Sequence, residues 1–386
     1  MKLKRSIWIG ALLVFIVGSW AKGQEKMMLN DDVEIVVKNK VEVTSVKSQD
    51  RTGTCWSFAT SSFIESEALR KGKGEHDISE MYFVRQTYPK KADNFVRRHG
   101  NATFGAGSLS HDVIIASKEF GVVPEEIYTG LSEGERYHNH GELQSVLKGF
   151  LDGLIKNRGG NLNPKWKGAY EAILNTYLGE VPQSFVYQGK EYTPMTFAKE
   201  ALDFNPNDYV EITSFTHRPY YEKFILNIPD NWANASYFNV PLDEFEQIMD
   251  HALANGYSIA WDGDVSEKEF VHQKGIAYAP SKKSQKSSDE KNAITTALKN
   301  ELQITEEMRQ NAYDNYSTSD DHLMHIVGLV TDKDGKKYYL TKNSWGTDND
   351  LGGYLYMTQS YVRLKSIAIM IHKDALPESI SKKMGV

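Results

Sequence analysis

The sequence has one cysteine in 386 residues, Cys55, so no disulfide can form within the chain. Recognised metal motifs are also missing: there is no HExxH, and no Cys, Asp or Glu completes a ligand pattern around His138 and His140. Phosphate-binding loops and dinucleotide fingerprints are absent as well. We therefore expect neither a metal nor a cofactor, and we expect His138 and His140 to be surface residues.

Long apolar runs occur only at the start of the chain. Basic residues, Lys2, Lys4 and Arg5, precede an apolar run over residues 7–17, and small residues follow. This order is typical of a secretory signal, and the run is short for a membrane span. We predict a signal peptide over residues 1–23, cleaved near Ala21 or Gly23, and a mature periplasmic or extracellular protein, residues 24–386, without a stable membrane anchor. An uncleaved anchor is the alternative.

Charge of one sign does not dominate any large region. The net charge is −6, with 45 basic and 51 acidic residues spread along the chain. A nucleic-acid-binding domain needs a concentrated basic surface, which this distribution does not predict. We expect no nucleic acid partner. With 40% hydrophobic residues, the chain can fill one large core or two smaller ones.

The pattern of apolar residues predicts a helical half followed by a β half. Residues 33–46 alternate as an extended lead-in, and residues 55–70 have helical periodicity. A further helix is predicted after Ser79, whose side chain would cap it. Another helix is predicted to end at Gly121. Strands are predicted at 257–261, 325–331, 337–341, 354–358 and 366–371. We place the helical half at about 48–127, a largely helical insertion at about 128–230, and the β half at about 231–386.

Cys55 is the candidate nucleophile. A lone cysteine is usually an inert, small apolar residue. Here the predicted helix begins at Cys55, so unpaired backbone N–H groups and the helix dipole favour the thiolate. Gln49, six positions earlier, has a side-chain amide that can donate to a developing oxyanion together with the Cys55 N–H. The same chemistry needs a base and a group that orients the base.

Two late histidines, His322 and His325, are candidates for the base. His325 leads directly into an apolar run, whereas His322 follows two aspartates. We expect His325 to lie on a strand and act as the base, and His322 to be a surface residue in a polar loop. Asn343 stands beyond a predicted hairpin. Its amide oxygen can hold the second N–H of the base, while Trp345 shields that hydrogen bond from water.

Two segments resemble those of papain-like cysteine peptidases. Residues 49–59, QDRTGTCWSFA, resemble the nucleophile segment, and residues 343–346, NSWG, resemble the asparagine segment. Thr54 departs from the small residue that this signature asks for before the cysteine. The resemblance implies an α+β papain-like fold with a helical half and an antiparallel, β-barrel-like half. It also implies a substrate cleft lined by Gly105, Gly107 and Trp345.

Other features resemble the bleomycin hydrolase and aminopeptidase C subgroup: WDGDV at residues 261–265, LMH at 323–325, and the long insertion before them. Members of this subgroup form hexameric rings, so the resemblance implies a homo-oligomer. They trim amino-terminal residues because a C-terminal arm enters the cleft, where its carboxylate meets the substrate's ammonium group. Val386 is the residue that would fill that role here. Two features depart from the subgroup: the tail after Ile371 is short, and the chain begins with an export signal.

The combined prediction is a cysteine-type aminopeptidase that hydrolyses peptide bonds at amino termini through Cys55, His325, Asn343 and Gln49. An endopeptidase with the same residues is the alternative, suggested by the short tail and the export signal. A third interpretation is a peptide-binding protein that has kept the cleft and lost the chemistry.

Overall fold

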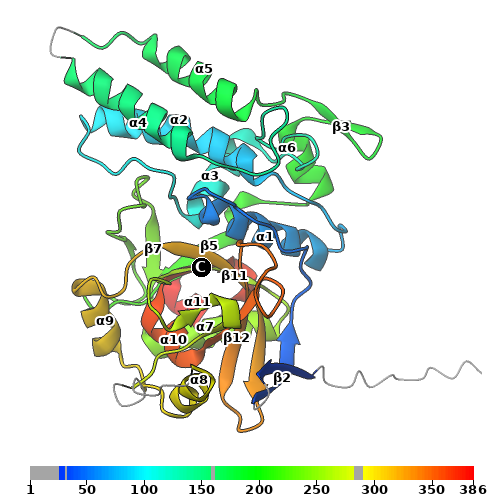
Figure 1. Cartoon of the computed structure of the whole chain (residues 1–386), viewed down its shortest axis with the longest axis vertical. Helices are drawn as coiled ribbons and strands as arrows, with labels where there is room; N and C mark the ends of the chain where they lie inside the picture. Colours follow the sequence, from blue (N-terminus) through cyan, green and yellow to red (C-terminus); the bar gives the residue numbers. More distant parts are fainter. Residues whose placement is uncertain (1–25, 31–32, 158–160, 282–289) are drawn as a thin grey trace, which may run out of the picture.

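The structure, a computed structural model, describes residues 26–30, 33–157, 161–281 and 290–386. The predicted signal peptide lies outside these residues. In Figure 1 a layer of helices lies above a large sheet, and a second group of helices lies on the lower part. Within the described ranges, no helix has the length and apolar character that a membrane crossing requires.

Three helices of the first half pack directly on the sheet or on one another. They are α1 (Cys55–Arg70), α2 (Glu80–Arg97) and α3 (Ser110–Phe120), which confirms the three predicted helices. Ser79 caps α2 as predicted, because its Oγ accepts the backbone N–H of Tyr82 at 3.1 Å. Gly121 ends α3 with a φ of 82°, a conformation that costs glycine little.

The segment after α3 extends the helical layer. It contains α4 (Gly141–Lys156), α5 (Trp166–Leu178), a hairpin of β3 (Phe185–Tyr187) and β4 (Lys190–Tyr192), the short α6 (Pro194–Thr196) and the turn η1 (Phe197–Ala201). Leu147 and Leu174 from this segment share one core with Tyr88 of α2. After the turn η2 (Pro206–Asp208), the chain already enters the large sheet, before the predicted boundary near residue 230.

The large sheet contains strands from both ends of the chain. Its order is β6-β7-β5-β14-β8-β11-β12-β13-β10-β9, and β2 joins β11 and β1. The bounds are β1 (Lys26–Asn30), β2 (Val33–Lys40), β5 (Tyr209–Thr213), β6 (Lys223–Ile225), β7 (Ser236–Asn239), β8 (Ile259–Gly263), β9 (Phe270–Val271), β10 (Ile276–Ala277), β11 (His322–Asp332), β12 (Lys337–Lys342), β13 (Tyr354–Thr358) and β14 (Ser366–His372).

The sheet differs from the predicted barrel-like half in two ways. Among the described strands, β6 and β9 form the two ends of the order and do not pair with each other, so this sheet is open. Two of its pairs, β5 with β7 and β10 with β13, are parallel, and the others are antiparallel. The five predicted strands are all present as β8, β11, β12, β13 and β14, but β11 begins at His322 rather than at His325.

The two faces of the central strands bury different cores, because successive side chains of a strand point to opposite faces. On β8, Ala260 packs toward α1, whereas Trp261 packs toward α7 (Leu242–Ala254). Further helices complete the lower part: α8 (Glu290–Lys299), α9 (Glu306–Asp314), α10 (Gln359–Lys365) and α11 (Glu378–Met384), with the turns η3 (His272–Lys274) and η5 (Lys373–Ala375).

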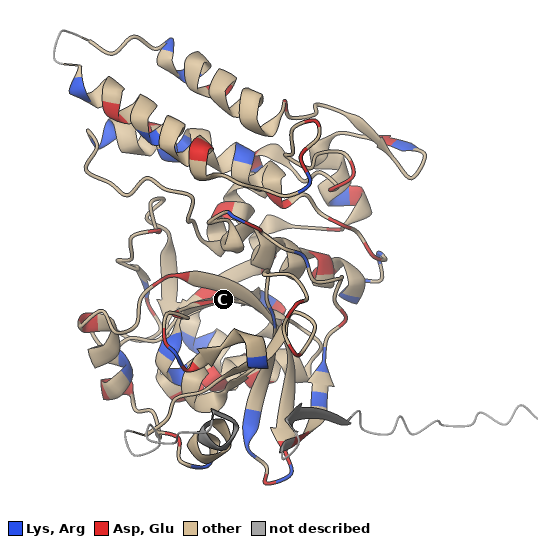
Figure 2. Cartoon of the chain, viewed as in Figure 1, with Lys and Arg blue, Asp and Glu red and all other residues tan. Residues whose placement is uncertain are grey.

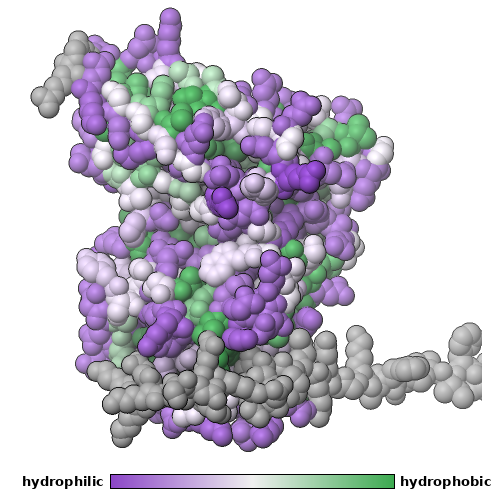
Figure 3. Space-filling model, in the orientation of Figure 1, coloured by the Kyte–Doolittle hydropathy of each residue, from purple (hydrophilic) through white to green (hydrophobic). Residues whose placement is uncertain are grey.

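The surface has mixed character. Figure 2 shows basic and acidic residues interspersed across both the helical layer and the sheet. In Figure 3 most of the visible face is hydrophilic, and apolar residues gather in smaller areas between the hydrophilic ones.

Candidate active site

Cys55 is the first residue of α1, which lies against β11. The thiol is 9% exposed and contacts the backbone of Leu323 on that strand. Thr54 stands just outside the helix, and its carbonyl accepts the N–H groups of Ser57 and Phe58 at 2.9 and 3.3 Å. The first N–H groups of a helix have no acceptor within it. The sequence prediction that Cys55 begins a helix is therefore confirmed.

His322 is the histidine that meets Asn343. Its Nε2 lies 2.8 Å from the Asn343 Oδ1, and both side chains are buried. The register explains the pairing: His325 stands opposite Lys342, so Asn343 stands opposite Met324. His322 lies on the same face of β11 as Met324, two residues away, because strand side chains alternate with a period of two.

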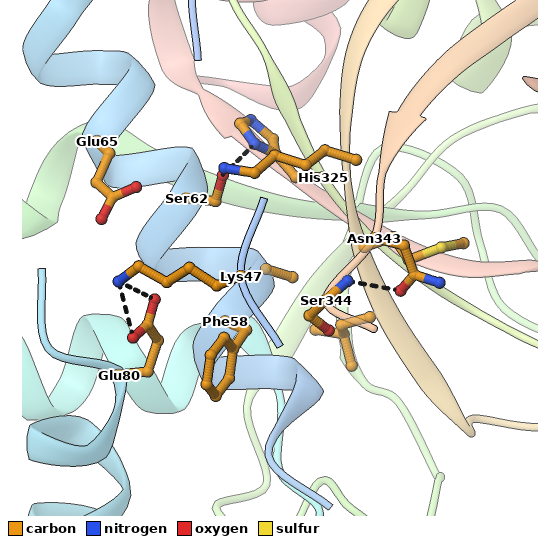
Figure 4. Close-up of a pocket in the computed structure, with 12 residues that line it drawn as sticks. Lys47, Phe58, Ser62, Glu65, Glu80, His325, Asn343 and Ser344 are labelled. Atoms are coloured by element: carbon orange, nitrogen blue, oxygen red, sulfur yellow. Dashed lines mark hydrogen bonds and ion pairs between the residues drawn. The ribbon is translucent and has the colours of Figure 1, made fainter. Parts of the chain in front are cut away.

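His325 lies on the other face of β11, so the expectation that it pairs with Asn343 is wrong. Its ring is fully buried against α1, with Nδ1 2.9 Å from the Oγ of Ser62. Ser62 is seven residues after Cys55, two helical turns or about 10 Å along α1. Figure 4 shows His325 beside Ser62, with Asn343 on the far side of the pocket next to Ser344. The prediction that His322 is a surface residue is also wrong, since it is 3% exposed.

Two further rings surround this pair. The Trp345 ring packs on the His322 ring with a centroid separation of 4.7 Å. The indole therefore lies beside the hydrogen bond between His322 and Asn343, where the sequence predicted that it would shield the bond of the base. His272, in η3, places its Nδ1 3.3 Å from the Nδ2 of Asn343. The Asn343 amide is thus fixed at both ends, with its oxygen toward His322 and its nitrogen toward His272. No motif marks His272, so it could not be identified before the structure was known.

Gln49 connects the nucleophile loop to the asparagine segment. Its Oε1 accepts a hydrogen bond from the Ser344 Oγ at 2.7 Å, and its Nε2 donates to the Thr52 carbonyl at 2.7 Å. The Gln49 backbone N–H also donates to the Ser344 carbonyl at 2.8 Å. Because an amide nitrogen carries two hydrogens, the Gln49 Nε2 keeps one N–H beyond its bond to Thr52.

The glycine-rich segment lies beside the start of α1. Trp56, next to Cys55, donates its indole N–H to the carbonyl of Ala106 at 3.0 Å. A Cβ on Gly107 would lie 2.0 Å from the Oδ2 of Asp230, whereas a Cβ on Gly105 would meet nothing within 4 Å. Gly107 therefore leaves the space that the Asp230 carboxylate occupies. The edge predicted from the resemblance is next to the candidate nucleophile.

Val386 is not brought to this site, so its predicted role in docking a substrate is wrong. The Val386 N–H and carbonyl both bond to Ser381 of α11, its own helix. Ile380 and Met384 of α11 pack into the core on the α7 face of the sheet, opposite the face that α1 covers. The residues that follow β14 form η5 and α11.

His138 and His140 are buried, so the expectation that they are surface residues is wrong. They are 9% and 5% exposed, because their segment pairs with the nucleophile loop: the Arg51 N–H donates to the His138 carbonyl, and the His140 N–H donates to the Arg51 carbonyl. Within the part of the chain that the structure describes, no group of three or more His, Cys, Asp or Glu side chains is arranged to hold a metal ion.

The electrostatics of the site favour the uncharged forms of Cys55 and His322. Burial raises the pKa of the Cys55 thiol to about 12, partly offset by the Leu323 backbone, and nearby aspartates raise it further. Burial also lowers the pKa of His322 to about 4, although its bond to Asn343 acts in the opposite direction. Burial therefore favours the neutral thiol and the neutral imidazole, whereas the helix N-terminus at Cys55 favours the thiolate.

Comparisons with known proteins assign the chain to the same class of peptidase. The family described as Peptidase C1-like family matches residues 174–385, and the family described as Papain family cysteine protease matches residues 30–93. The chain is similar to Aminopeptidase G of Lactobacillus delbrueckii subsp. lactis, with 22% identity over 88% of this chain and 84% of that protein. It is similar to Aminopeptidase C of Lactococcus lactis subsp. lactis (strain IL1403), with 22% identity over 86% and 81%.

A solved structure extends the likeness to the fold. The crystal structure of PepW from Lactobacillus rhamnosis HN001 (DR20) matches with a TM-score of 0.70 and 18% identity, covering 90% of this chain and 84% of that one. The papain-like fold and the resemblance drawn from the sequence are thereby confirmed. Since the first family match covers more than half of the chain, the protein belongs to the Peptidase C1-like family.

Proposed function

We propose that the protein is a cysteine aminopeptidase in which Cys55 is the nucleophile, His322 the base, Asn343 the group that orients the base, and Gln49 an oxyanion donor. The observation that carries this proposal is the 2.8 Å bond between His322 and Asn343, beside a cysteine at a helix N-terminus. The aminopeptidase mode is supported by the names of relatives that align over most of the chain.

The reaction follows from these positions. His322 takes the proton of the Cys55 thiol as the sulfur attacks the carbonyl carbon of the scissile bond. The developing oxyanion is held by the Cys55 backbone N–H and the free N–H of Gln49. His322 then gives its proton to the leaving amine, which leaves a thioester on Cys55. Water, deprotonated by His322, hydrolyses the thioester and restores the thiol.

The neutral forms of the Cys55 thiol and the His322 imidazole fit this sequence of steps. Because the pKa of Cys55 is raised and that of His322 is lowered by burial, the proton moves only as the carbonyl is attacked. The bond from His322 to the Asn343 oxygen favours the imidazolium that forms at that moment. We therefore expect slow alkylation of Cys55 by a small neutral reagent, and fast labelling by a peptidyl reagent that fills the site.

The test uses matched fluorogenic amides, one with a free amino group and one acetylated, with a Cys55→Ala control. Cleavage of the free substrate alone, lost in the control, is the expected result. Full activity in Cys55→Ala would overturn the proposal. A thiol-directed peptidyl inhibitor provides a second readout, since an inactive peptide-binding protein would not be labelled at Cys55.

An endopeptidase on the same residues is the second candidate. The observation that favours it is the position of Val386, whose contacts are with its own helix and not with the cleft. Equal cleavage of free and acetylated substrates would establish this alternative.

We also propose that the protein is exported, with residues 1–23 removed as a signal peptide. The basic, apolar and small-residue order of that segment supports the proposal. Sequencing the amino terminus of the protein from the periplasmic or extracellular fraction tests it, and a mature chain that begins at Met1 would contradict it.

A further inference from the structure

Three aspartates lie near enough to Cys55 to act on its charge, and they come from three separate segments. Asp262 is on β8, Asp320 precedes β11, and Asp230 is in the loop between β6 and β7. The carboxyls of Asp262 and Asp320 contact each other, and Asp320 accepts the backbone N–H of Asp230. We call these residues the acidic triad.

The register of the sheet places the acidic triad on the nucleophile's side. Asp262 stands directly opposite Leu323 in the β8–β11 pairing, on the same face as Ala260, which packs toward α1. Directly opposite side chains of antiparallel strands are about 5 Å apart. Since the Cys55 thiol contacts the Leu323 backbone, Asp262 is one strand spacing from the nucleophile.

Asp230 lies at the other end of the triad, next to Gly107. Its carboxylate fills the space left by Gly107, in the segment that Trp56 holds beside Cys55. The triad therefore extends from the glycine-rich edge to the sheet, next to the position of the scissile bond. Asp230 and Asp320 are only partly buried, so solvent and a substrate can reach them.

Asp262 is a buried carboxyl that lacks hydrogen-bond donors. It is 5% exposed, and neither of its oxygens has a hydrogen-bond donor among the described residues; its neighbour Asp320 offers another carboxyl. One oxygen of Asp320 also lacks a donor. Buried carboxylates are almost always paired with donors or cations, so this arrangement is costly unless something cationic or a shared proton completes it.

Nearby cations are hydrogen-bonded to other groups, although Lys91 interacts electrostatically with Asp230 and Asp320, and His111 with Asp320. His111 places its Nδ1 3.1 Å from Glu211 and its Nε2 3.7 Å from Asp112. Lys91 donates its Nζ to the carbonyls of Gly105 and Gly107. No ion pair within 4 Å joins a lysine, arginine or histidine to any member of the acidic triad in the described part of the chain.

We propose that the acidic triad binds the free α-ammonium group of the substrate, in place of a carboxylate at the end of the chain. This inference rests on the proposed aminopeptidase function. In an aminoacyl substrate the ammonium nitrogen is two bonds from the carbonyl carbon that Cys55 attacks. Asp262, about one strand spacing from the nucleophile, is thus at a distance that a single amino-terminal residue spans.

The same site links recognition to the nucleophile. Aspartates of the triad raise the pKa of Cys55, in addition to the larger effect of burial. A bound ammonium group offsets their charge, and the aminoacyl group that carries it covers the thiol from other reagents.

The test compares Asp262→Asn, Asp320→Asn and the double variant with the matched control Asp321→Asn. Asp321 is the same residue type, next in the chain, but it is exposed and accepts the Val265 N–H. With the free-amine substrate we expect KM to rise about 10- to 100-fold in the double variant, the size typical of losing a charged hydrogen-bond partner, with kcat within a few-fold. KM of the control should be unchanged, and the acetylated substrate should stay uncleaved by every variant.

A second measurement does not depend on turnover. Alanine amide and acetyl-alanine amide are compared for their ability to protect Cys55 of the wild-type protein from iodoacetamide. Protection by alanine amide alone, lost in the double variant, is the expected result. Equal protection by both, or unchanged KM in the double variant, would overturn the proposal even if the peptidase is active. Preference for lysine side chains in acetylated substrates would reassign the triad to a side-chain pocket.

Failure of the underlying function gives a different pattern. If Cys55→Ala retains activity, or the wild type cleaves neither substrate, the proposed peptidase chemistry is wrong, whereas the protection experiment still reports whether the triad binds an ammonium group. A double variant that does not fold leaves the wild-type comparison of the two amides as the deciding result.

Discussion

His322, the first residue of β11, and Asn343, the residue just after β12, lie with Nε2 2.8 Å from Oδ1, and His325, three residues further along β11, faces away toward Ser62. An odd spacing on a strand reverses the face, so only one of the two histidines can meet Asn343. The Trp345 ring over His322 and the His272 contact to Asn343 belong to that same face. This relationship leads to the first prediction.

His322→Ala should lower kcat/KM by about 100- to 10,000-fold, the usual contribution of a positioned acid–base group. His325→Gln should keep kcat within a few-fold and lower the melting temperature, because its ring fills a buried space beside Phe63. Steady-state kinetics and thermal unfolding of both variants check this. A folded His325→Gln protein without activity, beside an active His322→Ala, would restore His325 as the base.

Gln49→Glu removes the donors of the Gln49 amide and keeps its acceptor. The carboxylate can still accept from the Ser344 hydroxyl, but it loses the N–H that would face an oxyanion and the N–H that bonds the Thr52 carbonyl. We expect kcat to fall about 100- to 1000-fold with little change in KM, because the donor acts on the transition state. Ser344→Ala is the control for the structural bond alone, and it should affect stability more than kcat. A large loss in Ser344→Ala with none in Gln49→Glu would contradict the assignment.

His272 should act as a positioning residue. Burial lowers its pKa, so its neutral Nδ1 can accept the N–H of Asn343. His272→Ala should reduce kcat about 2- to 10-fold, the worth of one ordinary hydrogen bond, and His272→Gln should recover part of it. Kinetics over a range of pH distinguish this role from a titrating one, because the shape of the pH profile should not change. A shifted profile would show that His272 itself exchanges protons.

The sequence predicted the helices and strands that position the site, because their periodicities are strong and their caps are local. Cys55 at the start of α1 and Ser79 before α2 depend on neighbours within a few residues. The choice between His322 and His325 depended on where β11 begins. The aspartates before His322 suggested a loop, whereas strand pairing with β8 extends β11 by three residues.

Other parts of the site required long-range contacts that no local pattern encodes. His272 reaches Asn343 from a turn far away in the chain, and Asp230 reaches Gly107 from the loop between β6 and β7. Val386 was placed in the cleft by resemblance alone. The packing of α11 on the α7 face, through apolar residues at helical spacing, decides its position instead.

The acidic triad predicts a specific pH dependence for free-amine substrates. Burial, with the neighbouring aspartates, raises the pKa of Asp320 to about 7. Below that pH the carboxyl is neutral and binds an ammonium group less well, so KM should rise as the pH falls through 7. An α-amino group loses its proton near 7.7–8.0, so KM should rise again above about 8.

Measuring KM of the free-amine substrate from pH 5 to 9, together with the inhibition constant of its acetylated counterpart, checks this dependence. The acetylated compound carries no ammonium group, so its inhibition constant should not follow the same curve. The Asp321→Asn control should keep the minimum of the free-amine curve, and Asp320→Asn should flatten its acid side. Parallel curves for both substrates would assign the dependence to the catalytic groups rather than to the triad.

Gly107→Ala should impair binding of free-amine substrates, and Gly105→Ala provides the matched control. The new Cβ at 107 would lie 2.0 Å from the Asp230 Oδ2, so the carboxylate must move out of the triad, whereas the Cβ at 105 has open space. Crowding of this kind typically costs about 1–3 kcal/mol, and the displacement should raise KM for the free-amine substrate about tenfold. Thermal unfolding separates the stability cost from the binding effect. If both variants raise KM for free and acetylated substrates alike, the glycine edge shapes the cleft for the peptide backbone, and Asp230 has no part in recognising the ammonium group.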